Sequence, residues 1–475
     1  MTNEEITYYK NLKLEVNPLK DLLQNKAINV TIKTKISETQ SGGVIEAYTG
    51  FGKSFVIKKL CERYRVKNNG LITILVPSQY LEKMIKEDIE HIDNVKVFVI
   101  NTYTMYLDEI HETDFLICDE VHHILNNDSK YFSTALEKTK FKYFVGFSAF
   151  LEAKHKNFLL SHGINITFSI DLIDGLNLDI VPKFKIYNLG IDFTSQEKEQ
   201  YIKWEKIQNI NAQPFNEFQV ISKINGYEIA LFIASKEDKF NVKSWLINRV
   251  LNEENDIERE YYNIPKHDLC DLICKCLTLD IKPLDLVKAA FMYTKAVREK
   301  NNIIKHSQNK LILAKKYVES NQIKSIIFSP NSIVICDAIA KFGVNSTTIA
   351  YHSKINTGKR KKIIEAFNQN LFRNLVVIQA LDEGFSIDDV KRGLILDIVG
   401  VTLRNIQRLG RLLRVDLNDL DKMAEMIYVY HKSFEYYDDE IKDMIEIIPA
   451  DLKRLERAQK EFISIENISK LEDVL

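Results

Sequence analysis

The sequence predicts an α/β fold with two parallel-sheet domains and a mostly helical insertion between them. Short β-branched runs alternate with longer helical patterns, which is typical of a parallel sheet wrapped by helices. This alternation stops near Thr194 and resumes near Ser325, and 475 residues are too many for one ordinary core. The predicted parts are a first domain at 1–190, a helical insertion at 191–310, a second domain at 311–445 and a C-terminal helical tail at 446–475.

Five apolar segments are the predicted strands of the first domain. Each is apolar along its length, as expected of a strand that helices cover on both faces. They are Gly43 to Ala47, Leu71 to Val76, Val95 to Ile100, Phe115 to Asp119 and Phe141 to Ser148.

The helical insertion and the second sheet follow from a change of pattern. Thr194 and Glu197 have the spacing of a capping box, and apolar residues then repeat at helical spacing. The last thirty or so residues have the pattern of a charged amphipathic helix. The predicted strands of the second sheet are Ser325 to Ser329, Thr347 to Tyr351, Asn374 to Ile378, Gly393 to Asp397 and Met426 to Tyr430.

Charge and composition limit the partners. The 65 Lys and Arg residues nearly balance 66 Asp and Glu residues, so any groove for a polyanion must be local. No apolar run approaches the length that spans a bilayer, which argues against a membrane partner. The six cysteines are scattered and no signal-peptide pattern opens the chain, so we expect a reducing cytosolic or nuclear setting.

The segment 47–54, Ala-Tyr-Thr-Gly-Phe-Gly-Lys-Ser, is a candidate phosphate loop between a strand and a helix. Gly50 and Gly52 would let backbone N–H groups of Thr49 to Gly52, including Phe51, turn toward phosphate oxygens. Lys53 would reach the terminal phosphates, and Ser54 would ligate Mg²⁺. Ala47 stands where the usual pattern has its first glycine. The alternative is a glycine-rich turn with a chance Gly-Lys-Ser.

Asp119 and Glu120 follow an apolar strand and form a second candidate element of the site. Ligands of open α/β sheets bind at the carboxyl ends of strands. Asp119 would hold Mg²⁺ through water, and Glu120 would orient and deprotonate the attacking water. Taken alone, the pair is equally well explained as solvated acids in a turn, but the phosphate loop upstream favours the catalytic interpretation.

With these two motifs, the chain resembles the DExH branch of the superfamily 2 helicases. Leu75 to Ser78 resembles the strand and turn that contact the nucleic-acid backbone, which implies contacts by Pro77 and Ser78. Gly146 to Phe150 resembles the Ser-Ala-Thr motif that couples hydrolysis to strand movement. The resemblance implies a nucleic-acid contact by Ser148, which keeps its hydroxyl. Phe150 replaces the usual Thr and puts the contact of that third position in doubt.

The second half resembles the remaining motifs of the same family. Ile326 to Ser329 resembles the strand that opens the second domain, and the loop after Tyr351 implies backbone contacts by His352 and Ser353. Segment 379–385 resembles motif five, in which Asp382 would contact a ribose hydroxyl or link the two sites. Gly384 would permit close approach of the backbone there.

Residues 407–414, Gln-Arg-Leu-Gly-Arg-Leu-Leu-Arg, fit the family's QxxGRxxR motif, which begins at Gln407. Arg411 and Arg414 are spaced i, i+3, so both can point from one helical face and neutralise charge on a transferring phosphoryl group. Taken alone, this pair is more simply explained as a solvated basic helix face.

The resemblance implies two RecA-like domains that use ATP and Mg²⁺ to move along nucleic acid. The motif-five sequence, the insertion and the short tail resemble compact DNA helicases of phage and repair type, of the UvsW kind, so DNA is favoured over RNA. Two alternatives stay open: an RNA helicase or RNA-dependent ATPase, and a motor subunit of a restriction or defence complex. The insertion and the tail are the candidate surfaces for protein partners.

The insertion carries aromatic residues and one candidate metal group. The aromatics could stack on bases, but packing within the insertion explains most of them more simply. They are Trp204, Phe218, Tyr227, Trp245 and Tyr293. A zinc site is the minor alternative to buried cysteines, since paired Cys-x-x-Cys spacing is absent. Its ligands would come from His267, Cys270, Cys274 and Cys276.

Overall fold

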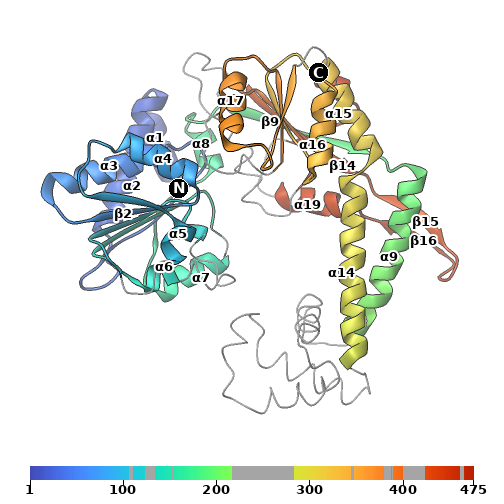
Figure 1. Ribbon diagram of the computed structural model, residues 1–475, viewed down its shortest axis with the longest axis horizontal. Coiled ribbons are helices and arrows are strands. Elements are labelled where there is room, and N and C mark those ends of the chain that lie inside the picture. Colours follow the sequence, from blue (N-terminus) through green and yellow to red (C-terminus); the bar gives the residue numbers. More distant parts are fainter. Residues whose placement is uncertain are drawn as a thin grey trace. The chain divides into compact units, whose positions relative to one another are not determined.

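The computed structural model describes residues 1–105, 111–123, 134–151, 153–216, 283–343, 347–378, 387, 389–398, 423–459 and 465–475. The chain forms two compact units (Figure 1). The first unit comprises Met1–Gly190, Leu311–Tyr430 and Lys453–Leu475, and it holds both large sheets. The second unit comprises Ile191–Lys310 and His431–Leu452. The predicted fold class is confirmed: two parallel-sheet α/β domains with helical segments between them.

The first sheet has six strands in the order β3-β2-β5-β7-β1-β8, and all its pairs are parallel. The five predicted strands are confirmed within one or two residues at each end. The sixth, β8, was not predicted, because as an edge strand it is only partly buried. The strands are β1 (Ser41–Ala47), β2 (Ile72–Val76), β3 (Val95–Val99), β5 (Phe115–Cys118), β7 (Tyr143–Ser148) and β8 (Ile166–Ile170).

Helices of the first domain pack on this sheet through apolar stripes. In α2, Leu19, Leu23 and Ala27 are buried at intervals of four residues, so they share one face of the helix. The principal helices are α1 (Asn3–Asn11), α2 (Val16–Lys33), α3 (Lys53–Lys67), α4 (Gln79–Asp88), α5 (Ile100–Met105), α7 (Ala153–Ser161) and α8 (Leu172–Asn177). Shorter elements are β4 (His111–Glu112), η1 (Val121–His123), α6 (Thr134–Glu137) and β6 (Thr139–Lys140).

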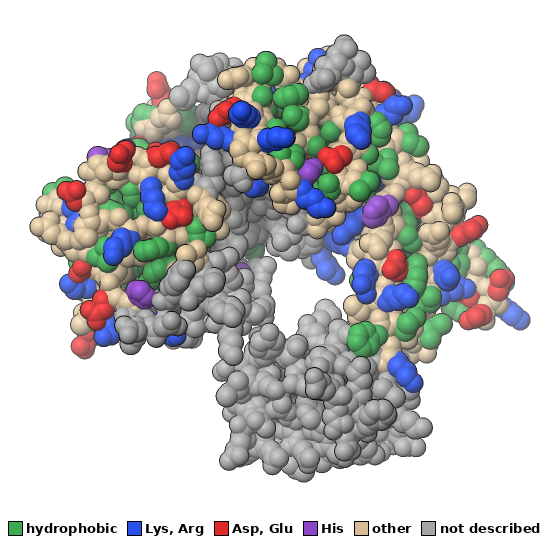
Figure 2. Space-filling view, viewed as in Figure 1, with side chains coloured by type: hydrophobic (Ala, Val, Ile, Leu, Met, Phe, Trp, Pro, Cys, Tyr) green, Lys and Arg blue, Asp and Glu red, His purple; other side chains and the backbone are tan. Residues whose placement is uncertain are grey.

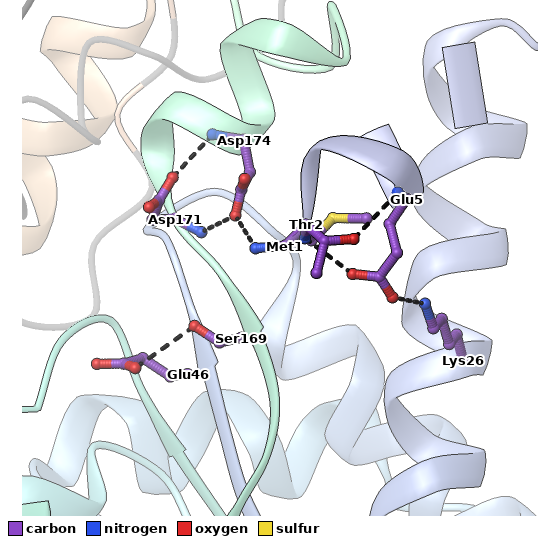
Figure 3. Close-up of polar contacts among 8 residues, drawn as sticks. All are labelled: Met1, Thr2, Glu5, Lys26, Glu46, Ser169, Asp171 and Asp174. Carbon is purple, nitrogen blue, oxygen red and sulfur yellow. Dashed lines mark hydrogen bonds and ion pairs between the residues drawn. The ribbon is translucent and has the colours of Figure 1, made fainter. Parts of the chain in front are cut away.

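Polar contacts attach α1 to the rest of the domain (Figure 3). Thr2 and Glu5 form a capping box at the start of α1, and Glu5 also accepts a hydrogen bond of 2.7 Å from Lys26 of α2. The ammonium group of Met1 lies 2.9 Å from Asp174 of α8, and both side chains are buried. These bonds hold α1 against both α2 and α8.

The second sheet has seven strands in the order β11-β12-β10-β13-β14-β9-β17. Its five predicted strands are confirmed within a few residues. The strands are β9 (Lys183–Ile191), β10 (Ser325–Phe328), β11 (Thr348–Tyr351), β12 (Asn374–Val377), β13 (Arg392–Ile395), β14 (Met423–His431) and β17 (Ile465–Ile468). Its helices are α15 (Gln308–Ser320), α16 (Ile333–Lys341), α17 (Thr357–Asn368), α19 (Ala450–Ala458) and η4 (Leu471–Asp473).

Two segments of the second sheet differ from the sequence-based division of the chain. Strand β9 lies within the predicted first domain at 1–190 but pairs in the second sheet. The predicted helical tail at 446–475 is helical in α19 and then contains β17, which pairs in parallel with β9 from Ile465 to Ile468. Pairing with β9 satisfies backbone groups that a free edge strand would leave open. Strand β17 lacks the apolar run that revealed the other strands, because its two central residues, Glu466 and Asn467, are polar and exposed.

The second unit contains a helical hairpin and a β-hairpin (Figure 1). Its elements are α9 (Ser195–Asn216), α14 (Pro283–Lys305), β15 (Phe434–Asp438) and β16 (Asp443–Ile447). The predicted capping box begins α9: the Thr194 amide donates to Glu197 at 2.9 Å, and the Glu197 amide donates to Thr194 at 3.3 Å. Tyr201, Ile304 and Ile447 form its buried apolar cluster. Residues 217–282 lie outside the described part.

A buried ionic group joins the two segments of the second unit. Asp451 Oδ2 lies 2.8 Å from His431 Nδ1 and 3.0 Å from Lys310 Nζ, and none of the three side chains is more than 2% exposed. The ring of Phe193 stacks on His431 at 3.9 Å. Burial alone would raise the pKa of Asp451, but Lys310 and His431 lower it below its ordinary value. Burial lowers the pKa of His431, although its bond to Asp451 partly opposes this.

The depressed pKa of His431 predicts that the second unit loses stability in mild acid. The unfolded chain takes up this proton near the ordinary value of 6.5, whereas the folded chain resists it. The stability that comes from keeping His431 neutral is therefore complete above that pH. The free energy of unfolding falls as the pH drops below it. Both tryptophans, Trp204 and Trp245, lie in the sequence of this unit, so urea unfolding followed by their fluorescence measures it.

His431→Gln should remove this part of the pH dependence, while the exposed His162→Gln on the first unit should not. An unchanged slope between pH 7.5 and 5.5 in His431→Gln would contradict the assignment.

Candidate functional site

Four of the predicted motifs meet at one edge of the first sheet. Because all its strands are parallel, their carboxyl ends share that edge. The phosphate loop follows β1, Pro77 and Ser78 follow β2, Asp119 and Glu120 follow β5, and Ser148 ends β7.

The candidate phosphate loop connects β1 to the N-terminus of α3. Gly50 and Gly52 have φ values of 103° and 92°, a region that glycine enters without strain. The Phe51 ring is fully buried against Tyr48 and Phe168, so only the backbone of Phe51 is available to a nucleotide. A loop that ends at a helix N-terminus presents N–H groups and partial positive charge, which favours a phosphate.

Helix α2 supports this loop through two side chains that the sequence analysis did not single out. Lys20 Nζ donates to the Gly50 carbonyl at 3.1 Å, and Gln24 Nε2 donates to the Phe51 carbonyl at 2.8 Å. Burial lowers the pKa of Lys20. A Cβ at Gly52 would sit 2.7 Å from Gln24 Nε2, so the loop and α2 are in close contact. Lys20 and Gln24 are spaced i, i+4 on the helix that precedes the loop, and this spacing is the sequence signal that could have identified them.

The acidic pair lies near the loop but not on the adjacent strand. Strand β7 separates β5 from β1, so the acidic pair and the loop follow strands that are not adjacent in the sheet. Lys53, the first residue of α3, nevertheless reaches across, and its Nζ lies 2.8 Å from Glu120 Oε1. Asp119 is buried and accepts a hydrogen bond of 3.1 Å from the Glu120 amide. Glu120 has a φ of 49°, which costs on the order of 1–3 kcal/mol and is typical of functional positions.

His122 and Ser148 extend this group toward β7. Ser148 Oγ donates to the Phe150 carbonyl at 2.8 Å, so its oxygen can accept a hydrogen bond from His122 Nδ1, which lies 3.1 Å away. His122 Nδ1 also lies 3.5 Å from Glu120 Oε2. Ser148 is fully buried, whereas the predicted contact with nucleic acid would require an exposed hydroxyl. In this structure Ser148 holds His122 instead.

The other predicted nucleic-acid contacts have different surroundings. Ser78 caps α4 by accepting from the Leu81 amide at 3.4 Å, and both Pro77 and Ser78 are partly exposed. His352 is buried, with Nε2 3.1 Å from Asp337 Oδ1, and Ser353 is exposed. The predicted second-domain residues Asp382, Gly384, Gln407, Arg411 and Arg414 lie outside the described residues.

The predicted metal-binding residues lie partly inside and partly outside the described residues. Ser54 and Asp119 offer a hydroxyl and a carboxylate, oxygen donors that suit Mg²⁺. No group of three or more His, Cys, Asp or Glu side chains that could hold a metal ion occurs in the described ranges, and the candidate zinc group at 267–276 lies outside them. Of the insertion aromatics, Trp204 and Tyr293 are described and partly buried. No helix of the described chain is long and apolar enough to cross a membrane.

The support from α2 predicts an effect on nucleotide binding. Gln24→Ala and Lys20→Met each free one loop carbonyl, so the loop amides should be less well oriented toward phosphate. We expect each variant to weaken binding of a fluorescent ATP analogue by roughly tenfold, the equivalent of one hydrogen bond of about 1.4 kcal/mol. Asn29→Ala, on the same helix away from the loop, is the control. Unchanged affinity in both variants would exclude this support.

Comparison with known proteins gives one family match and one curated relative. Residues 308–416 match the family described as helicase conserved C-terminal domain. The chain is 22% identical over 434 residues to the DNA 3'-5' translocase XPB2 of Sulfurisphaera tokodaii, covering 87% of this chain and 82% of that protein.

Two solved structures are also similar to the chain. One is Dbp5 of S. cerevisiae bound to RNA and ADP BeF3, with a TM-score of 0.49, 12% identity and coverage of 94% of this chain and 89% of that chain. The other is the Hef helicase domain of Pyrococcus furiosus, with a TM-score of 0.44, 17% identity and coverage of 86% of this chain and 97% of that chain.

Proposed function

We propose that this chain is a superfamily 2 helicase, a nucleic-acid-dependent ATPase that uses ATP hydrolysis to move along DNA. The observation that carries the proposal is the group of residues at the edge of the first sheet. There a phosphate-type loop, its lysine and an acidic pair come together, with Lys53 Nζ 2.8 Å from Glu120.

The proposed ATP site assigns one role to each of these residues. The amides of Thr49 to Gly52 and the N-terminus of α3 bind the phosphates. Lys53 neutralises charge on the terminal phosphates, and Ser54 and Asp119 hold Mg²⁺, which supplies further neutralisation when bound. Glu120 orients the attacking water and accepts its proton.

We propose that His122 and Ser148 relay the state of the ATP site to the nucleic acid. Both are buried, and His122 lies between Glu120 and Ser148, within 3.5 Å of each. A shift of Glu120 during hydrolysis would therefore move His122 and change its contact with Ser148 at the end of β7. Phe150 lacks the hydroxyl that the family has at its position. Within this motif the Ser148 hydroxyl is therefore the group that remains to continue the relay.

The second domain completes the proposed motor on the basis of its sequence motifs. Arg411 and Arg414 would contact the transferring phosphoryl group, with Gln407 and Asp382 beside it. Pro77, Ser78 and Ser353 would hold the nucleic-acid backbone without reading bases, which predicts movement that is largely independent of sequence.

DNA is the proposed track, and forked or branched DNA is the proposed preferred form. The curated relative is described as a DNA translocase, and it covers most of this chain. The preference for forks rests on the resemblance of the motifs to compact phage and repair helicases.

Steady-state ATP hydrolysis with single-stranded DNA, duplex DNA, forked DNA or RNA tests the proposal. We expect the strongest stimulation by forked DNA, loss of hydrolysis in Lys53→Ala, and a fall of about 10²–10⁴-fold in kcat for Glu120→Gln with ATP binding retained. Stimulation by RNA alone would show that the track is RNA and not DNA. Full activity of Glu120→Gln would show that Glu120 is not the general base.

The relay predicts that hydrolysis and movement can be separated. Ser148→Ala removes the acceptor for His122, so ATP hydrolysis should persist while displacement of a strand from forked DNA is lost. Ser169→Ala, a matched exposed serine on β8, is the control. Equal loss of hydrolysis and displacement in Ser148→Ala would show that the contact between His122 and Ser148 is needed for ATP hydrolysis and not for its coupling to movement.

A further inference from the structure

The hairpin β15–β16 of the second unit has two faces of different character. Four of its five cross-strand pairs are Phe434 with Ile447, Glu435 with Glu446, Tyr436 with Ile445 and Tyr437 with Met444. Because side chains alternate along a strand, the first and third pairs share one face and the other two pairs share the opposite face. We call these the inner face and the outer face.

The inner face has a structural role that the fold explains. Phe434, Tyr436 and Ile447 pack with Tyr201 in the apolar cluster of the helical hairpin. Two lysines of α9 also lie on this side: Lys198 Nζ is 4.7 Å from the ring centre of Phe434, and Lys206 Nζ is 5.4 Å from that of Tyr436.

The turn of the hairpin is held in place by one buried carboxylate. Asp438 accepts hydrogen bonds from the Glu440 and Ile441 amides at 2.9 and 3.2 Å, and from the Tyr436 hydroxyl at 3.0 Å. Lys206 Nζ lies 2.9 Å away, and this contact lowers the pKa of Asp438 to about 2. The carboxylate therefore stays ionised, and the turn is fixed before any partner arrives.

The outer face combines exposed apolar groups with unneutralised acids. Tyr437 and Met444 are 57% and 53% exposed, and Ile441 in the turn is 66% exposed. Beside them Glu435 and Glu446 stand directly opposite each other, an arrangement of like charges that destabilises a strand pair. In the described part of the chain neither carboxylate has a cation within 4 Å. Figure 2 shows acidic and hydrophobic side chains together where Figure 1 places the hairpin.

We propose that the outer face of this hairpin docks a protein partner through a segment in which basic and apolar side chains alternate. A cation between Glu435 and Glu446 would relieve their repulsion, and an apolar neighbour would cover Tyr437 and Met444. A turn fixed in advance lowers the entropic cost of that contact. Nucleic acid does not fit the outer face, because its phosphates would meet two carboxylates. This inference is independent of the proposed function.

A fluorescence-anisotropy titration of the full chain without ATP tests the proposal. The probe is a synthetic labelled peptide of alternating Arg and Leu, compared with Arg-Ser and Glu-Leu peptides of equal length. We expect the Arg-Leu peptide to bind most tightly. Both the Glu435→Lys/Glu446→Lys and the Tyr437→Ser/Met444→Ser variants should weaken it at least about tenfold, as for central interface residues. Glu199→Lys and Ile210→Ser, exposed on α9, should leave binding unchanged.

A folding measurement and an unwinding assay accompany the titration. Glu435→Lys alone creates a pair of opposite charges across the strands, so its thermal midpoint should rise and the variant should stay folded. Equal affinity for all three peptides, or binding by the double-lysine variant as tight as the parent's, would overturn the proposal. Loss of forked-DNA unwinding in the hairpin variants, with peptide binding intact, would instead identify a strand-separating element.

Discussion

Parallel pairing in the first sheet is the constraint on which the candidate site depends. A parallel sheet places the carboxyl end of every strand at one edge, so motifs far apart in sequence become neighbours. Lys53 and Glu120 are separated by 67 residues and by strand β7, yet their charged groups are 2.8 Å apart. Without this pairing, the loop, the acidic pair and Ser148 would be unrelated polar turns.

The site is also supported by groups that take no direct part in the proposed chemistry. Lys20 and Gln24 engage two consecutive loop carbonyls, which leaves the loop amides to a phosphate. Ser148 orients His122, which in turn lies beside Glu120. Such supporting hydrogen bonds fix reactive groups before substrate arrives, which is how preorganised sites stabilise charge.

The second unit depends on a buried group of charged side chains. Its segments are joined by the buried charges of Lys310, His431 and Asp451, of which Asp451 bonds to both others. Buried charges of this kind are costly unless they are paired, so they specify one arrangement of the segments that carry them. The β-hairpin projects from this base and presents its outer face. The second unit thus presents the exposed outer face of the hairpin, whereas the first unit carries the candidate ATP site.

The sequence alone determined the fold class, because strands buried on both faces and the helices between them leave periodic patterns that survive without tertiary contacts. It also predicted the candidate phosphate loop and the acidic pair, since local backbone chemistry restricts the residues that such a loop allows. Tertiary structure alone decided that β9 and β17 complete the second sheet and that Lys20 and Gln24 support the loop. It also decided that Glu435 and Glu446 oppose each other. Strand partners and cross-strand register depend on contacts between distant segments, which a linear pattern does not encode.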